Sequence, residues 1–159
     1  MSSLHPTAAQ LQRFALFSDL TLDECETLTS CFQLNDYSAG SMLIQQDDLS
    51  THLYLIVEGI VEVRLPLVGA QTTTRVAKFG PGECVGELAL ARVARRAASA
   101  VAELKSQCLT ASAVELTEVC AKHPRIGFAV YKKLSEIITD RLVATNMQLR
   151  NSESHAGRA

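Results

Sequence analysis

The segment 82–102, GECVGELALARVARRAASAVA, constrains this chain more than any other stretch. It follows a Gly80-Pro81 turn signal, and its second glycine, Gly86, stands directly before Glu87. Glycine permits a sharp turn, and the first N–H groups of a short helical turn after it can bind an anion. A nearby arginine, Arg96, can hold a phosphate through two parallel hydrogen bonds, and a carboxylate can accept from a hydroxyl. The segment therefore predicts a sugar-phosphate site.

The same residues resemble the phosphate-binding cassette of cyclic-nucleotide-binding domains of the catabolite activator protein-like type. The match runs without a gap through Val85-Gly86-Glu87-Leu88-Ala89-Leu90, five residues, and then Arg96-Ala97-Ala98-Ser99. The resemblance implies that Arg96 binds the cyclic phosphate, that Glu87 binds the ribose 2′-hydroxyl, and that backbone N–H groups of 86–89 contact the phosphate. The candidate ligand-binding residues in the cassette are Gly86, Glu87, Leu88, Ala89, Arg96, Ala97 and Ser99.

Two departures from the family pattern change the surroundings of the site. Val85 replaces the usual aromatic residue, which removes packing, and Arg95 stands where proline is common. Arg92 and Arg95 add positive charge near the predicted phosphate site. The alternative interpretation is that these arginines form a solvated run and that Glu87 is a surface acid.

Composition limits the classes of protein that need considering. The chain has 159 residues, 47% of them hydrophobic, which suits one domain with one core. Its net charge of −2 gives no bulk attraction to nucleic acid or to an anionic membrane. No apolar run approaches the roughly 18 residues of a membrane span, and residues 1–6 do not begin a secretory signal. We therefore expect a cytoplasmic protein with no direct nucleic-acid or membrane partner.

The cysteines do not predict a metal site. Five are present and no two form a Cys-x-x-Cys pair, which does not suit zinc or an iron–sulfur cluster. We expect them to be small core residues in a reducing environment. They are Cys25, Cys31, Cys84, Cys108 and Cys120.

Hydrophobic patterning predicts an α+β fold. Two N-terminal helices are expected, at 7–14 and at 22–31, the second beginning at the capping-box pattern Thr21-Leu22-Asp23-Glu24. Short strands are expected at 32–38, 42–45, 53–57, 60–65, 71–79, 97–103 and 106–110. The predicted architecture is a single domain over 1–150. It consists of N-terminal helices (1–31), an antiparallel β-roll or jelly-roll barrel (32–111) with the cassette and its short phosphate-binding helix (82–100), and C-terminal helices (112–150).

The C-terminal region predicts one short helix and one long helix. Ser112 begins a helix that ends near Lys122, His123-Pro124 interrupts it, and a helix over 125–149 follows. Its apolar stripe comprises Ile126, Val130, Leu134, Ile137, Ile138, Leu142, Thr145 and Leu149. About 25 residues extend roughly 37 Å, more than one small barrel covers, so we expect the distal half to pair with a second copy in a homodimer. Residues 151–159 are expected to be a disordered tail.

The resemblance also extends to the long helix, which in the family closes over the nucleotide base. It assigns to Thr145 a contact with the base amino group. The function that it implies is a cyclic mononucleotide sensor that signals through this helix to an unidentified effector protein or a second subunit. cAMP is favoured over cGMP, because cGMP-selective members often have a hydroxyl residue where this chain has Ala97. The alternative is a ligand-free protein-interaction module that keeps only the fold.

Two other classes fit the sequence less well. A metal-dependent enzyme in a small barrel needs clustered histidines, and the predicted barrel contains only His52, so we expect no catalytic activity and no resident cofactor. DNA-binding relatives continue into a helix-turn-helix domain, whereas this sequence stops at Ala159. We therefore expect a stand-alone member without a DNA-binding domain.

Overall fold

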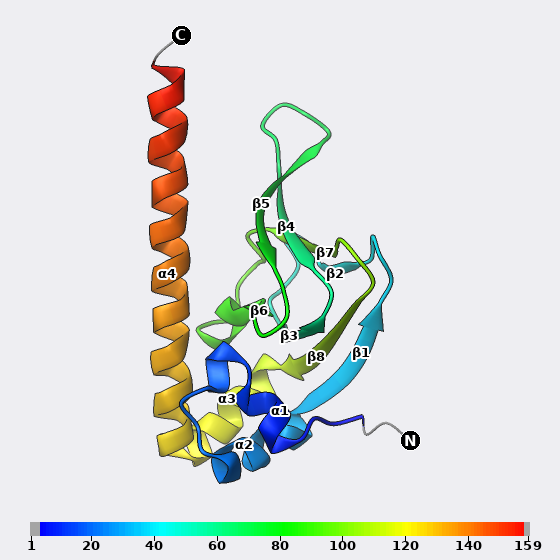
Figure 1. Ribbon diagram of the computed structural model, residues 1–159, viewed down its shortest axis with the longest axis vertical. Helices are drawn as coiled ribbons and strands as arrows, with labels where there is room; N and C mark the ends of the chain where they lie inside the picture. The colour runs from blue at the N-terminus through cyan, green and yellow to red at the C-terminus, as the bar shows by residue number, and fades with distance from the viewer. Residues whose placement is uncertain (1–3, 158–159) are drawn as a thin grey trace.

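Two antiparallel sheets form a β-roll above a layer of short helices, and one long helix runs along the side of both (Figure 1). The computed structural model describes residues 4–157. The first sheet has the order β1 (Phe32–Tyr37), β8 (Ser106–Ser112), β3 (His52–Glu58) and β6 (Cys84–Val85). The second has the order β2 (Met42–Ile44), β7 (Ser99–Ala102), β4 (Val61–Pro66) and β5 (Thr73–Phe79). The predicted fold class is confirmed.

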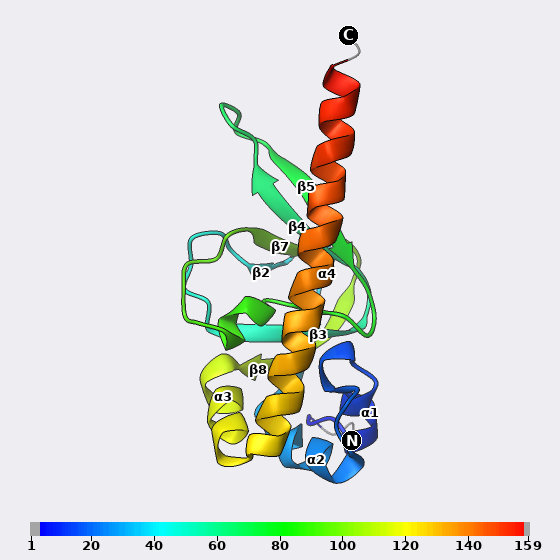
Figure 2. The ribbon, with the colours of Figure 1, turned by 90° about the vertical axis from the view of Figure 1, so that its left-hand side faces the viewer.

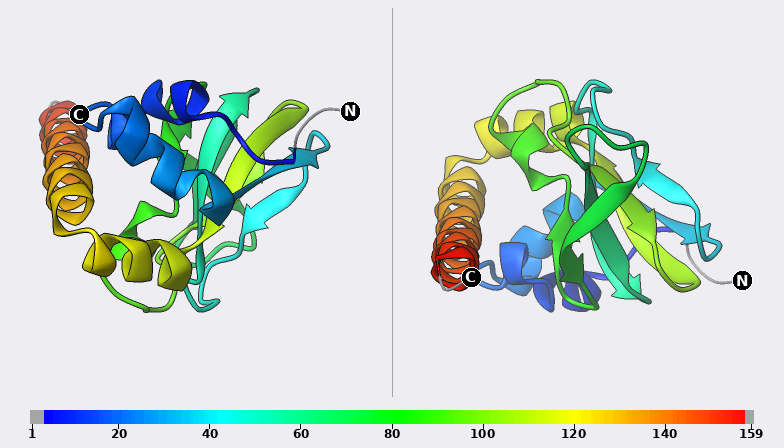
Figure 3. Two further views of the ribbon diagram at one scale, coloured as in Figure 1. Left: turned by 90° about the horizontal axis from the view of Figure 1, so that it is seen from below. Right: turned by 90° about the horizontal axis from the view of Figure 1, so that it is seen from above.

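The N-terminal helices are capped as the sequence predicts but are shorter. In α2 (Leu22–Leu28) the Thr21 side chain accepts from the Glu24 N–H, and the Glu24 side chain accepts from the Thr21 N–H. A 3₁₀ turn, η2 (Thr29–Cys31), replaces the end of the expected helix. The expected helix over 7–14 likewise becomes α1 (Ala8–Gln12), and a second 3₁₀ turn, η1 (Ala15–Phe17), follows it. These helices cover the lower side of the roll (Figure 3).

The hydrophobic core has two parts. The larger lies between the helices and the first sheet and includes Phe17 and Phe32, whose ring centroids are 5.6 Å apart. The smaller fills the inside of the roll around Ile56 and Val61. All five cysteines are free thiols, and every one except Cys31 is buried, as expected for small core residues.

Helix α3 (Ala113–Lys122) leads directly into α4 (Pro124–Ala156), which stands along one side of the molecule (Figure 2). The two helices meet closely at Gly127, where an added Cβ would lie 2.7 Å from the Cys120 carbonyl oxygen. The first half of α4 buries Ile126, Ala129, Val130 and Leu134 against the core. Its second half extends past the helical layer beside the roll and is largely exposed.

The long helix does not end where the sequence predicts. We expected an end near Leu149 and a disordered tail over 151–159, but the helix continues through Ala156. The polar residues after Leu149 end the apolar stripe without stopping a helix, because no helix-breaking residue occurs before Gly157. Residues 158–159 of the predicted tail lie outside the described residues.

Within residues 4–157, no helix combines the length and the apolar character of a membrane span. No group of three or more His, Cys, Asp or Glu side chains in this range is arranged to hold a metal ion.

Candidate functional site

The backbone at Gly86 turns the chain from β6 into a four-residue 3₁₀ turn, η3 (Glu87–Leu90). Gly86 has φ +78°, the left-handed region that other residues rarely adopt. A Cβ there would lie 2.9 Å from the His52 carbonyl oxygen and 3.0 Å from Arg96 Nη1. Glycine is therefore required both by the backbone conformation and by the close approach of Arg96.

Arg96 is held by two backbone carbonyls. Its Nη1 donates to the Gly86 carbonyl at 3.1 Å, and its Nη2 donates to the His52 carbonyl. Burial lowers the pKa of the Arg96 guanidinium, but an arginine remains charged in proteins. These two bonds use only part of its five-donor fork, so the remaining N–H groups are available to an anion. The start of η3 lies beside it, where the N–H groups of Glu87 and Leu88 have no intrahelical acceptor.

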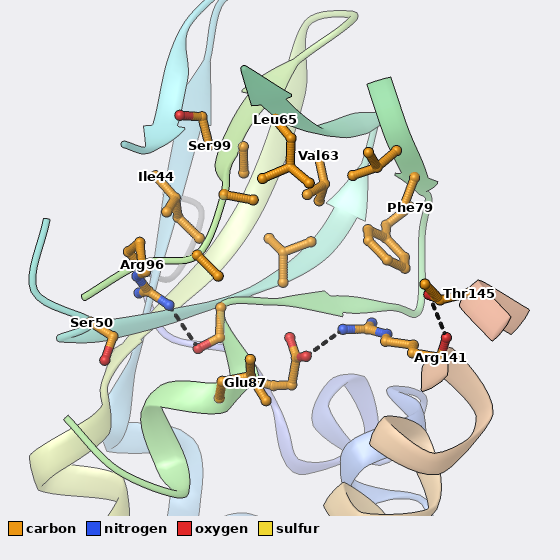
Figure 4. Close-up of a pocket in the computed structure, with 18 of the residues that line it drawn as sticks. Ile44, Ser50, Val63, Leu65, Phe79, Glu87, Arg96, Ser99, Arg141 and Thr145 are labelled. Carbon is orange, nitrogen blue, oxygen red and sulfur yellow. Dashed lines mark hydrogen bonds and ion pairs between the residues drawn. The ribbon is translucent and has the colours of Figure 1, made fainter. Parts of the chain in front are cut away.

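Glu87 is buried, 6% exposed, and pairs with a residue of α4. Its Oε1 lies 2.6 Å from Arg141 Nη1 (Figure 4). Arg141 Nη2 donates to the Cys84 carbonyl at 2.6 Å, and the guanidinium lies 4.2 Å from the centroid of the Phe79 ring. Arg141 therefore joins the cassette, β5 and α4.

The sequence-based prediction did not include Arg141. The signal that could have found it is its position four residues before Thr145, which places both side chains on one face of the helix. The structure shows both lining the same cleft.

A cleft of about 1020 Å³ lies between the cassette, the β4–β5 hairpin and the distal half of α4. Its strand side is apolar and includes Val63, Leu65 and Phe79 (Figure 4). Its helix side carries Arg141, Thr145 and other polar residues. The predicted site residues that line it are Gly86, Glu87, Leu88, Arg96, Ala97, Ser99 and Thr145.

Ala89 is the one predicted site residue that does not line the cleft. Its side chain is 4% exposed and belongs to the larger core. Its N–H donates to the Gly86 carbonyl at 3.2 Å, the bond that closes the first turn of η3. The backbone of Ala89 therefore does not offer its N–H to a ligand, because the 3₁₀ turn already uses it.

The two other arginines of the cassette, Arg92 and Arg95, behave differently from Arg96. Arg92 and Arg95 are exposed and line the cleft. Arg95 Nη1 donates to the carbonyl of Asp47, whose φ is +70°. Arg95 thus supports the β2–β3 loop, while Arg96 alone of the three donates to the cassette backbone.

A sequence model of the cyclic nucleotide-binding domain matches residues 34–123, which is more than half of the chain. The chain belongs to the cyclic nucleotide-binding domain family. The cyclic AMP receptor protein of Thermus thermophilus is 30% identical to it over 134 residues, which are 84% of this chain and 60% of that protein. The match to Glutaminase 2 of Bradyrhizobium diazoefficiens is 27% identical and covers 85% of this chain but 21% of that protein.

Solved structures agree with this assignment. A cyclic nucleotide-binding domain from Methylobacillus flagellatus has a TM-score of 0.80 and 25% identity, and the match covers 92% of this chain and 82% of that one. The resemblance drawn from the cassette is therefore confirmed at the level of family and fold. The chain spans less than two-thirds of the length of the receptor and the glutaminase that it matches.

Proposed function

We propose that this chain is a sensor module for a cyclic mononucleotide, with cAMP preferred over cGMP. The observation that carries the proposal is the convergence of Arg96, the start of η3 and Glu87 on one cleft. A guanidinium that can bind phosphate, an anion-binding turn and a buried carboxylate at this spacing match a ribose cyclic phosphate.

Each part of the ligand has a counterpart in the cleft. Arg96 and the N–H groups of Glu87 and Leu88 bind the cyclic phosphate. Glu87 binds the ribose 2′-hydroxyl through Oε2, since Oε1 is the oxygen that pairs with Arg141. The base occupies the space between the apolar strand side and α4. Catalysis has no role in this proposal, since the ligand is bound and released unchanged.

The preference for cAMP is supported by the hydrogen bonding of Thr145. Its hydroxyl donates to the Arg141 carbonyl at 2.9 Å within α4, so its oxygen remains only as an acceptor. An acceptor at this position favours adenine, which has an amino group at position 6 of the purine, over guanine, which has a carbonyl oxygen there. Ala97, directly after Arg96, offers no hydroxyl to guanine.

Signalling through α4 is supported by the uneven way in which this helix is held. Its first half is packed into the core, whereas its distal half is joined to the cassette through Arg141. A ligand bound at Glu87 Oε2, next to the Oε1 that pairs with Arg141, changes the surroundings of this attachment. It shifts the balance between two helix positions by its differential affinity for them. An effector protein or a second copy of the chain binds to α4 differently in its two positions.

A homodimer is supported by the outer face of the distal half. Leu142, Val143 and Met147 are exposed there, and none of them lines the cleft. These positions lie beyond the core-packed first half of α4, so they can form a contact between two helices. Sedimentation of the wild type and of Leu142→Glu tests this, since the charge should shift a dimer to monomer.

Thermal unfolding with cAMP, cGMP and 5′-AMP tests the proposed function. A ligand at 100 times its dissociation constant should stabilise the protein by about 2.7 kcal/mol. We expect this with cAMP and not with 5′-AMP, and we expect Arg96→Ala to abolish it. Arg95→Ala is the matched control, because Arg95 is adjacent but donates to Asp47. No shift with any nucleotide would contradict the proposal and favour a ligand-free interaction module.

A further inference from the structure

Gln148 differs from the other polar residues on the helix side of the cleft in its hydrogen bonding. The hydroxyls of Thr145 and Ser152 donate within α4, to the Arg141 carbonyl at 2.9 Å and to the Gln148 carbonyl at 3.0 Å. Each of these hydroxyls therefore presents only an acceptor to the cleft. The side-chain amide of Gln148 has no protein partner among residues 4–157, and it can both donate and accept.

The position of Gln148 along α4 suits the far edge of a base. An α-helix rises 1.5 Å per residue, so Thr145 lies about 6 Å and Gln148 about 10.5 Å beyond Arg141. If the ribose lies at the Glu87–Arg141 pair, the base extends from there toward these two residues. This inference rests on the proposed function.

The strand side of the cleft, which faces α4, cannot distinguish one base from another by hydrogen bonding. Val63, Leu65 and Val76 line it and carry no side-chain hydrogen-bonding groups. They can pack against the face of any purine, which gives affinity without selectivity. Recognition of the base edge is therefore left to the polar residues elsewhere in the lining, and α4 contributes Thr145, Gln148 and Ser152 to these.

We propose that Gln148 is the residue that identifies the base, by pairing its amide with an amino group and the adjacent ring nitrogen of adenine. A glutamine amide places a donor and an acceptor side by side, which matches the N6 and N7 atoms of adenine. The Thr145 oxygen accepts the second amino hydrogen. Guanine in the same orientation would place its carbonyl oxygen against the Thr145 acceptor, which is unfavourable.

Affinity measurements with two ligands test this assignment. They are cAMP and the 3′,5′-cyclic monophosphate of purine riboside, which lacks the amino group. We expect the wild type to prefer cAMP by about tenfold, as one or two hydrogen bonds allow. Gln148→Met keeps the length of the side chain and removes the amide, so it should lower cAMP affinity about tenfold. It should lower analogue affinity by a smaller factor, because the analogue keeps N7 but has no amino group. Asn151→Leu removes an amide from α4 outside the cleft lining and should change neither.

The outcomes separate this inference from the proposed function. An unchanged ratio of the two affinities in Gln148→Met, with cAMP binding still dependent on Arg96, would overturn the assignment of Gln148 alone. Failure of the wild type to bind either nucleotide would overturn the proposed function and this inference with it.

Discussion

Glu87 in the cassette and Arg141 on α4 form an ion pair of 2.6 Å. Beyond Arg141, the described part of α4 makes no hydrogen bond or ion pair outside its own helix. The polar attachment of the distal half to the domain therefore depends on one side chain, which also contacts the Cys84 carbonyl and the Phe79 ring. A ligand that uses Glu87 would act directly on this attachment.

A double-mutant cycle should measure this pair. The Glu87 carboxylate is 8% exposed and the Arg141 side chain 27%, so Arg141→Met leaves a mostly buried carboxylate unpaired. We expect that change to lower the free energy of unfolding by about 1–3 kcal/mol, less than for a fully buried pair because Arg141 is partly solvated. Adding Glu87→Gln should recover part of the loss, as measured by urea unfolding of the four proteins. Additive losses would show that the two residues are not coupled.

Replacement of Arg96 by lysine should weaken cAMP binding although the charge is kept. The planar guanidinium of arginine can donate to the Gly86 and His52 carbonyls and to a phosphate at the same time. The compact ammonium group of lysine cannot reach these three acceptors in the same arrangement. We expect Arg96→Lys to lower affinity by about 10–100-fold, or about 1.4–2.8 kcal/mol, in calorimetric titration. Arg92→Lys, an exposed arginine of the same cleft, should change affinity less than twofold. Equal losses in both variants would show that the loss does not depend on the two carbonyl bonds that hold Arg96.

Gly86 and Gly82 form a matched pair for testing the close approach at the cassette. Both have positive φ, +78° and +89°, so alanine at either position carries a backbone cost of about 1–2 kcal/mol. An added Cβ at Gly82 meets nothing within 4 Å, whereas at Gly86 it lies 2.9 Å from the His52 carbonyl oxygen. Gly86→Ala should therefore be less stable than Gly82→Ala in urea unfolding, and it alone should weaken cAMP binding. Equal stability of the two variants would contradict the steric argument.

The sequence predicts the cassette well because its determinants are local. The glycine, the carboxylate and the arginine lie within eleven positions, 86–96, so their spacing alone indicates the site. Arg141 could not be identified in this way, since its partner Glu87 is distant in the sequence and only the packing of α4 brings them together.

Local patterns were least informative where an element is short or its end carries no stop signal. β6 has two residues, Cys84 and Val85, too few to show an alternation, and its pairing with β3 defines it. The apolar stripe of α4 ends at Leu149, whereas the helix continues to Ala156, so the stripe does not mark the end of the helix. In contrast, the alternation of β4 did indicate which residues face inward, and Val63 and Leu65 line the cleft.

The buried thiols predict that the protein loses stability at alkaline pH. Burial raises the pKa of Cys84 and of Cys108 to about 12 each, whereas an unperturbed cysteine thiol has a pKa of about 8.5. Above pH 8.5 the unfolded chain releases these protons and the folded chain retains them. The stability that each thiol contributes is therefore fully present below about pH 8.5 and is lost as the pH rises toward 12, by about 1.4 kcal/mol per pH unit.

Urea unfolding at pH 8, 9 and 10 measures this loss. Other groups also titrate in this range, so the comparison is between the pH slopes of the wild type and of Cys108→Ala, which retains all of them. Cys108 is the better choice because Cys84 lies beside Arg141, whose charge also acts on that thiol. We expect a shallower decline of the free energy of unfolding in Cys108→Ala, whatever its stability at pH 8. The same slope in both proteins would mean that the Cys108 thiol titrates alike in the folded and unfolded chains.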